Sequence, residues 1–126
     1  MSSVIRLIVP ASAAWVVLVR TAASACCARL DFDVDRLEDV RLAVDEAVSQ
    51  VILDAPAGSD VTCGFRVSGA DLDITITAAS LSGQVPAHDT FSWIVLRALV
   101  DTVTAEVDEG LVRLHLHIHR HVPVDA

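Results

Sequence analysis

Two polar side chains with the chemistry of a catalytic or metal site lie four residues apart near the middle of the chain. Glu46 carries a carboxylate that can act as a general base, and Gln50 carries an amide oxygen that can bind a cation. On a helix, residues four apart lie one above the other on the same face. The spacing therefore brings a base and a cation ligand together, although an ordinary solvated pair has the same spacing.

Four histidines alternate with other residues along the last segment of the chain: His115, His117, His119 and His121. Because side chains alternate along a strand, the four histidines share one face. Histidines two apart on a strand can bind Zn²⁺, but no neighbouring Cys or carboxylate motif completes such a site. The pattern favours a solvated sheet face that Arg113 shares. A metal site, a pH sensor or a dimer interface is the alternative.

The three cysteines are predicted to be reduced thiols that pack as small apolar side chains. Cys26, Cys27 and Cys63 form no CxxC spacing, and their number is odd. A lipidation signal before Cys26 is disfavoured because Arg20 and Thr21 interrupt the apolar run. No run reaches the roughly eighteen apolar residues that a membrane helix needs. The sequence therefore predicts a cytoplasmic protein without a membrane segment.

One amphipathic helix from Arg36 to Ala55 is predicted to position Glu46 and Gln50. Asp33 or Asp35 can cap its start, and Pro56 with Gly58 ends it. Its apolar residues recur at three- and four-residue steps and form one stripe. The stripe consists of Leu37, Val40, Val44, Ala47, Val48 and Val51. Asp45 lies on a different face and is expected to be solvated.

The remaining pattern predicts a single domain, residues 1–126, with the element order β-α-α-β-β-α-β-β. The first helix is expected to bury Trp15, Leu18, Val19, Ala22 and Cys26. This order is typical of a two-layer α/β (α+β) sandwich with three helices on one face of a mixed, mostly antiparallel sheet. The tail 121–126 is expected to fray. The expected strands span 4–9, 61–67, 72–78, 103–107 and 111–119. The first and third helices are expected to span 13–30 and 92–100, and a loop is expected to span 79–90.

Composition and charge exclude some classes of function. The chain has 126 residues, of which 53% are hydrophobic and 21% charged, as expected of one globular domain with a sizeable core. The net charge is −8, with nine arginines and no lysine. This balance argues against nucleic-acid binding, which needs a basic surface. It suits a partner with a basic surface, such as a DNA-binding protein.

Two segments carry a resemblance to a known family. Residues 37–52 are LEDVRLAVDEAVSQVI, and residues 91–103 are FSWIVLRALVDTV. The first resembles the N-box helix of the GHKL ATPase and kinase superfamily, with the pattern xDxRxAVxEAxxN. The second resembles that superfamily's helix GLxIVRxLVDEV. Together they are most similar to the RsbW and SpoIIAB type of anti-sigma factor, close to the actinobacterial sigma-F group. The first match rests on Arg41, Ala43, Val44, Glu46 and Ala47.

The resemblance assigns roles to several positions. It places Glu46 at the general-base carboxylate and Gln50 where the family has an Asn that gives Mg²⁺ an amide oxygen. In the family pattern LxIxVxDxGxG, Ala78 replaces the Asp that binds the adenine amino group, and Ser80 and Ser82 replace the two glycines. Alanine cannot accept that hydrogen bond, and serine resists the positive φ that glycine allows.

The segment before the third helix also departs from the family. A glycine-rich stretch is replaced by residues 88–93, in which Phe91 and Trp93 are expected to be bulky where phosphates would pass. The resemblance therefore implies a degenerate ATP site with a vestigial Glu46 and no required cofactor. The alternative is a functional site that binds ATP and Mg²⁺, with Gln50 as a magnesium ligand.

The function that the resemblance implies is binding. An anti-sigma factor of this type sequesters an alternative stress or sporulation sigma factor, and a STAS-type anti-anti-sigma antagonist releases it. Such proteins are usually homodimers, and Arg20, Arg36 and Arg41 are candidate partner contacts. One alternative is an active ATP-dependent serine/threonine kinase that phosphorylates the antagonist. Another is a metal-binding domain built on the histidine strand.

Overall fold

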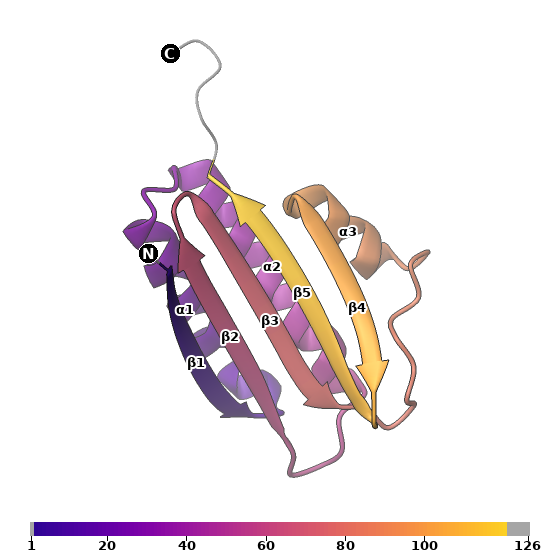
Figure 1. Cartoon of the computed structure of the whole chain (residues 1–126). Helices are drawn as coiled ribbons and strands as arrows, with labels where there is room; N and C mark the ends of the chain where they lie inside the picture. Colours follow the sequence, from indigo (N-terminus) through magenta and orange to yellow (C-terminus); the bar gives the residue numbers. More distant parts are fainter. Residues whose placement is uncertain (1, 121–126) are drawn as a thin grey trace.

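The computed structural model describes residues 2–120, which fold into one sheet covered on one side by helices (Figure 1). The predicted element order is confirmed, with a short 3₁₀ turn, η1, added before the first helix. Expectations about His121 and the tail 121–126 lie outside the described residues. The elements are β1 (Ser2–Pro10), η1 (Ala13–Trp15), α1 (Val16–Arg29), α2 (Val34–Leu53), β2 (Asp60–Ser68), β3 (Asp71–Ala79), α3 (Phe91–Leu99), β4 (Thr102–Asp108) and β5 (Leu111–His119).

The sheet has five strands in the order β1-β2-β3-β5-β4, and every neighbouring pair is antiparallel. The expectation of a mixed sheet is therefore corrected, whereas the two-layer α/β sandwich is confirmed. Tight turns join β2 to β3 and β4 to β5. Glu109 and Gly110 have φ of 51° and 78°, and two successive positive φ values match the twist of antiparallel strands. Two hairpins thus make up four of the five strands.

The core lies between the sheet and α2, the central helix of the helical layer (Figure 1). Asp33 caps α2 by accepting a hydrogen bond from the Arg36 backbone N–H at 2.7 Å. The predicted apolar stripe of α2 is buried apart from Leu37, which is partly exposed, and Ala43 joins it. On β2 and β3 the inward side chains alternate as predicted, from Val61 to Ala78. Burial of this apolar surface is the main stabilising term of the fold.

The buried face of α1 differs from the prediction. Val19, Ala23, Cys26 and Cys27 are buried, whereas Trp15 and Leu18 are 44% and 43% exposed. Trp15 lies in η1, whose three-residue turn is out of phase with the α-helix that follows. Leu18 and Val19 are adjacent in sequence and therefore lie about 100° apart around the helix, so that Val19 is buried and Leu18 is not.

All three cysteines are buried and free, as the sequence predicted. Burial raises the pKa of Cys26, and it raises the pKa values of Cys27 and Cys63 to about 12. Thiols with raised pKa values are poor nucleophiles, so these side chains act in packing. Within residues 2–120, no helix is long and apolar enough to cross a membrane.

Two charged residues on α2 are placed differently from the prediction. Arg36 is only 5% exposed, so its expected role as a partner contact is wrong. Its guanidinium donates to the Asp101 carboxylate, to the His119 carbonyl at 3.1 Å and to the Leu99 carbonyl at 3.4 Å. Asp45, expected to be solvated, instead binds Arg20 of α1 at 2.9 Å. Both differences arise because charges near an element interface can pair across it.

Candidate functional site

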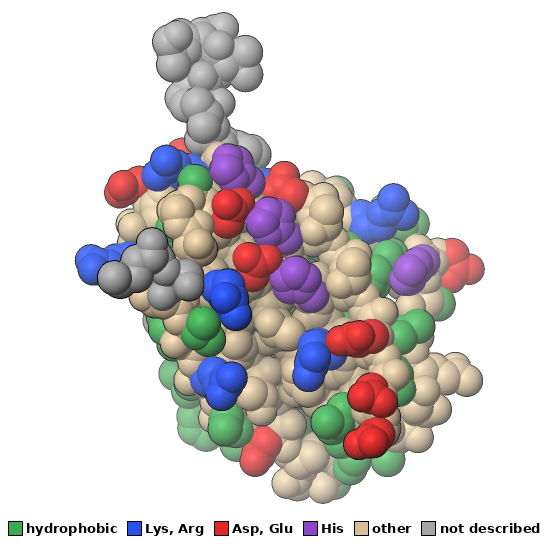
Figure 2. Space-filling view, in the orientation of Figure 1, with side chains coloured by type: hydrophobic (Ala, Val, Ile, Leu, Met, Phe, Trp, Pro, Cys, Tyr) green, Lys and Arg blue, Asp and Glu red, His purple; other side chains and the backbone are tan. Residues whose placement is uncertain are grey.

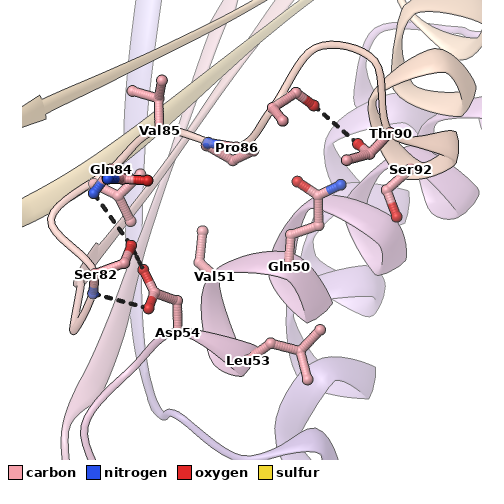
Figure 3. A pocket seen from close by; sticks show the side chains of 12 residues that line it. Gln50, Val51, Leu53, Asp54, Ser82, Gln84, Val85, Pro86, Thr90 and Ser92 are labelled. Atoms are coloured by element: carbon pink, nitrogen blue, oxygen red, sulfur yellow. Dashed lines mark hydrogen bonds between the residues drawn. The ribbon is translucent and has the colours of Figure 1, made fainter.

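The candidate site is an open pocket of about 390 Å³ at the C-terminal end of α2 (Figure 3). The loop 80–90 forms one wall, and the first turn of α3 forms another. Val51 of α2 and Val112 of β5 contribute apolar surface. The polar side chains that line it are Gln50, Asp54, Ser82, Gln84, Thr90 and Ser92.

Asp54, the C-terminal cap of α2, holds the start of the pocket loop. Its carboxylate accepts hydrogen bonds from the Ser80 hydroxyl, from the Ser82 hydroxyl at 2.7 Å and from the Ser82 backbone N–H at 3.0 Å. Hydrogen bonding from Ser80, followed by that from Ser82, lowers the pKa of Asp54. An acid at a helix C-terminus is disfavoured by the helix dipole, and these donors offset that effect. We call Asp54, Ser80 and Ser82 the Asp54 clasp.

The far end of the loop is fixed by Thr90, the N-terminal cap of α3. Its hydroxyl donates to the Ala87 carbonyl at 3.0 Å and accepts from the Trp93 backbone N–H at 3.2 Å. The loop is therefore held at both ends, by the Asp54 clasp and by the Thr90 cap. The segment between them includes Val85 and Pro86, which are among the residues that line the pocket (Figure 3).

Gln50 contributes the one polar atom of the pocket that is buried without a partner. Its side chain points from α2 toward the loop and Ser92 (Figure 3). Its amide oxygen, Oε1, is buried and accepts no hydrogen bond from the residues that the structure describes. A buried acceptor without a partner destabilises the protein by about 1–3 kcal/mol, so this oxygen is suited to a donor or a cation.

A second polar cluster lies on the open face of the sheet. The β3–β5 register places Asp73 opposite His117 and Asp71 opposite His119. One oxygen of Asp73, Oδ1, contacts His115 Nε2 at 2.9 Å and His117 Nδ1 at 2.8 Å, and Asp71 contacts His119 Nδ1 at 2.8 Å. The expectation of a histidine row without nearby carboxylates is therefore wrong. Even so, no group of three or more potential ligands within residues 2–120 has metal-binding geometry.

The pKa values follow from this pairing. The hydrogen bond with Asp73 is the largest effect on His117 and raises its pKa, against desolvation. Burial by itself would raise the pKa of Asp73. The hydrogen bonds from His117 and His115 together outweigh this effect of burial, so the pKa of Asp73 is lowered. Opposite charges that share hydrogen bonds favour each other's charged form.

Known proteins resemble the chain in both sequence and structure. Two proteins named Anti-sigma-F factor RsbW, from Mycobacterium tuberculosis strains CDC 1551 / Oshkosh and ATCC 25618 / H37Rv, are each 34% identical to it over 86 residues. The chain is a relative of the RsbW-type anti-sigma factors. The match covers 68% of this chain and 51% of each relative, so the chain spans about half the length of the curated relatives it matches. No protein-family model matches the sequence.

A solved structure shows the same fold. It contains the RsbU and RsbW domains of Rv1364c from Mycobacterium tuberculosis, and its TM-score with this chain is 0.72. The sequence identity is 17%, and the match covers 96% of this chain and 33% of that chain. The predicted fold class is therefore confirmed independently of the sequence relatives.

The site positions that the RsbW-type pattern assigns are only partly brought together. Gln50 and Ser82 line the pocket, and Ser80 adjoins it through the Asp54 clasp. Glu46 lies one turn before Gln50 on α2, is half-buried and is not part of the pocket lining. Ala78 is 2% exposed and belongs to the core. Of the assigned side chains, the pocket therefore contains the Gln50 amide and the Ser82 hydroxyl but not Glu46, the expected general base.

The two aromatic residues expected in the phosphate path lie elsewhere. Trp93 is 1% exposed, belongs to the core and stacks against His88 with 4.4 Å between ring centroids. Phe91 is 81% exposed and does not line the pocket. The expectation is wrong because the first turn of α3 presents Ser92 to the pocket, and its neighbours on either side point in other directions.

The functional residue that sequence reasoning missed is Asp54. The sequence contains a signal for it, because an acid at the end of a helix needs donors to offset the dipole. Two serines at positions 80 and 82 supply those donors, but they are separated from Asp54 by a hairpin. Only the folded arrangement shows that these three side chains meet.

Proposed function

We propose that the chain is a cytoplasmic anti-sigma factor that binds and sequesters an alternative sigma factor. We further propose that a STAS-type anti-anti-sigma antagonist releases that sigma factor. The observation that carries the proposal is the 34% identity to two proteins named Anti-sigma-F factor RsbW. The net charge of −8 is complementary to a basic, DNA-binding partner. Three free, buried thiols support a reducing compartment.

Transcription in vitro tests the sequestering role. RNA polymerase is combined with each alternative sigma factor of the source genome in turn, and the purified chain is added in increasing amounts. We expect transcription with one sigma factor to fall to background near stoichiometric chain, and addition of the matching antagonist to restore it. Transcription with the housekeeping sigma factor is the control and is expected to stay unchanged. The proposal fails if the chain lowers transcription with none of the alternative sigma factors.

We also propose that the nucleotide site is degenerate. The Ala78 methyl group offers no acceptor to an adenine amino group, and it packs in the core. The carboxylate that lines the pocket, that of Asp54, already accepts three hydrogen bonds. Mg²⁺ prefers near-octahedral oxygen coordination, and Glu46 does not line the pocket with Gln50. These residues do not fit ATP and Mg²⁺, and the proposed function is binding.

A specific observation keeps a serine/threonine kinase as the second candidate. The pocket of about 390 Å³ is open, and the buried Gln50 oxygen has no partner among the described residues. ATP binding is tested by calorimetry with and without Mg²⁺, and phosphoryl transfer by incubating labelled ATP, the chain and the antagonist. We expect neither signal. A Kd below about 100 μM would overturn the degenerate nucleotide site, and label on the antagonist that Glu46→Gln abolishes would establish the kinase.

We propose that the protein is a homodimer, as the resemblance implies. β1 is an edge strand of the sheet, and its side chains Ile5 and Ile8 are 47% and 63% exposed. Exposed apolar side chains on an edge strand favour association. Light scattering during size-exclusion chromatography is expected to give twice the chain mass of 13.4 kDa. A mass of one chain across micromolar concentrations contradicts the dimer.

A further inference from the structure

Three arginines gather around a hollow on the open face of the sheet, away from the helices and the α2 pocket. The hollow has a volume of about 440 Å³, and Arg6, Arg66 and Arg113 lie at its rim. Its floor is formed by Gly64 together with threonines of β2 and β3. Figure 2 shows blue side chains on this face beside the purple histidines. We call this feature the arginine hollow.

The register explains how the hollow forms. Arg6 on β1 lies opposite Gly64 on β2, and Gly64 lies opposite Thr75 on β3. Because side chains of one face alternate, Arg6, Gly64 and Arg66 all belong to the open face. Glycine has no side chain, so the sheet surface is depressed between the two arginines. A Cβ at position 64 would meet only Thr75, whose hydroxyl oxygen lies 3.8 Å away.

The charges of the arginine hollow are poorly balanced. Of its three arginines, only Arg113 has an ion pair within the described part of the chain, with Glu106 at 3.4 Å. Asp73 lies opposite Arg66 in the register, but its Oδ1 is bound by His115 and His117. Both histidines contact this carboxylate, and it forms no ion pair with Arg66 within residues 2–120. Clustered like charges repel one another, and an external anion relieves this repulsion.

Exposed apolar side chains flank the arginines on β1. Val4 and Ile8 lie two residues on either side of Arg6, on the same face, and are 52% and 63% exposed. An apolar residue, a cation and an apolar residue in a row on one face match an extended segment that carries apolar, acidic and apolar side chains at every second position, because those side chains also share one face. A nucleic acid would supply anions too, but its phosphate backbone offers no apolar side chains to Val4 and Ile8.

We propose that the arginine hollow binds the acidic side chains of a polypeptide segment from a partner protein. The arginines supply charge-assisted hydrogen bonds to the carboxylates, and the flanking side chains of β1 contact the apolar residues of the segment. This surface is separate from the α2 pocket, so the proposal stands whether or not that pocket binds a nucleotide. The arginine hollow thus gives this acidic protein a local basic surface that can bind an acidic segment of a partner.

The probe is a short fluorescein-labelled peptide with Leu, Glu and Leu at every second position and Ser between them, and fluorescence anisotropy is the measurement. Arg6→Gln and Arg66→Gln are each expected to weaken binding about two- to fivefold, and the double variant about tenfold. Arg97→Gln is the matched control, because Arg97 is an exposed arginine on α3 in the helical layer. It is expected to leave binding unchanged. Rising salt is expected to weaken binding to the wild-type chain.

A second variant tests the shape of the hollow with every charge kept. Gly64→Thr fills the floor with a strand-favouring side chain and is expected to reduce peptide binding while the thermal midpoint stays or rises. The proposal is overturned if the wild-type chain does not bind the peptide, or if a Gln-for-Glu peptide binds equally well. It is also overturned if the double variant binds like Arg97→Gln, or if a single-stranded oligonucleotide shows the same arginine dependence.

Discussion

At the scale of single residues, Arg36 connects parts of the chain that are far apart in sequence. Its guanidinium joins the start of α2 to the end of α3 and to the last residue of β5. Asp101, which directly precedes β4, accepts from both Arg36 and the His119 backbone N–H. A hydrophobic stripe gives no indication that the charged residue beside it is buried. The role of Arg36 therefore could not be predicted from periodicity.

Replacing Arg36 by Met removes the guanidinium donor from two carbonyl groups and from the Asp101 carboxylate, which keeps the His119 backbone N–H as a donor. We expect a loss of about 2–3 kcal/mol in the free energy of unfolding, because the lost hydrogen bonds involve a charged group. Arg41→Met is the matched control on the same helix. Its ion pair with Glu38 at 3.0 Å is largely exposed, so its expected loss is below about 0.5 kcal/mol. Urea denaturation measures both, and equal losses would contradict the structural role of Arg36.

The His117–Asp73 pair makes stability depend on pH. Because the folded pKa of His117 is raised, its contribution is fully present below the unfolded value of about 6.5. The contribution is lost as pH rises through the folded pKa. Asp73→Asn is expected to lower the pKa of His117 and to reduce stability more below pH 6.5 than above the folded pKa. NMR titration of the histidine rings and thermal midpoints across that window measure the two effects.

Asp60→Asn is the control for the His117 prediction, because Asp60 is an exposed carboxylate at the first position of β2. It is expected to leave the titration of His117 unchanged. An imidazole that titrates below about 6.5 in the wild-type protein would refute the prediction. So would an Asp73→Asn variant in which His117 titrates as it does in the wild-type chain.

At the scale of elements, alternation and turns were sufficient for the strands. β5 spans the predicted residues, and β2 and β3 differ from prediction by about one residue at their ends. The central helix was found because one apolar stripe extends over its length. The buried face of the first helix was only partly predicted, with Val19 and Cys26 right and Trp15 and Leu18 wrong, because its sequence is apolar on nearly every side. A helix of this kind is oriented by its neighbours, and a sequence pattern does not contain that information.

The Asp54 clasp connects α2 to the pocket loop, and its removal is expected to loosen that loop. In Asp54→Ala, the Ser82 backbone N–H loses its acceptor, so its hydrogen exchange is expected to accelerate. Thr90 at the other end retains its cap, so the Trp93 amide is expected to exchange as before. Asp60→Ala is the control. Unchanged exchange at Ser82 would show that the carboxylate does not hold the loop.

At the scale of the whole molecule, the fold class followed from element order, but the two polar clusters did not. The Asp54 clasp joins residues 26 and 28 positions apart. The histidine cluster joins residues more than 40 positions apart. The histidine cluster depends on the β3–β5 register, which only the folded sheet fixes. Sequence resemblance named Gln50, Ser80 and Ser82 without the carboxylate that organises the two serines.

The central proposal for this protein is that it binds its partner without a nucleotide. The direct test is a calorimetric titration of the cognate sigma factor into the chain, with and without Mg²⁺ and ATP. We predict one Kd for both conditions, equal within about twofold, because we propose that the nucleotide site is degenerate at Ala78 and around the Asp54 clasp. Absence of sigma-factor binding, or binding that appears only when Mg²⁺ and ATP are present, would contradict the account.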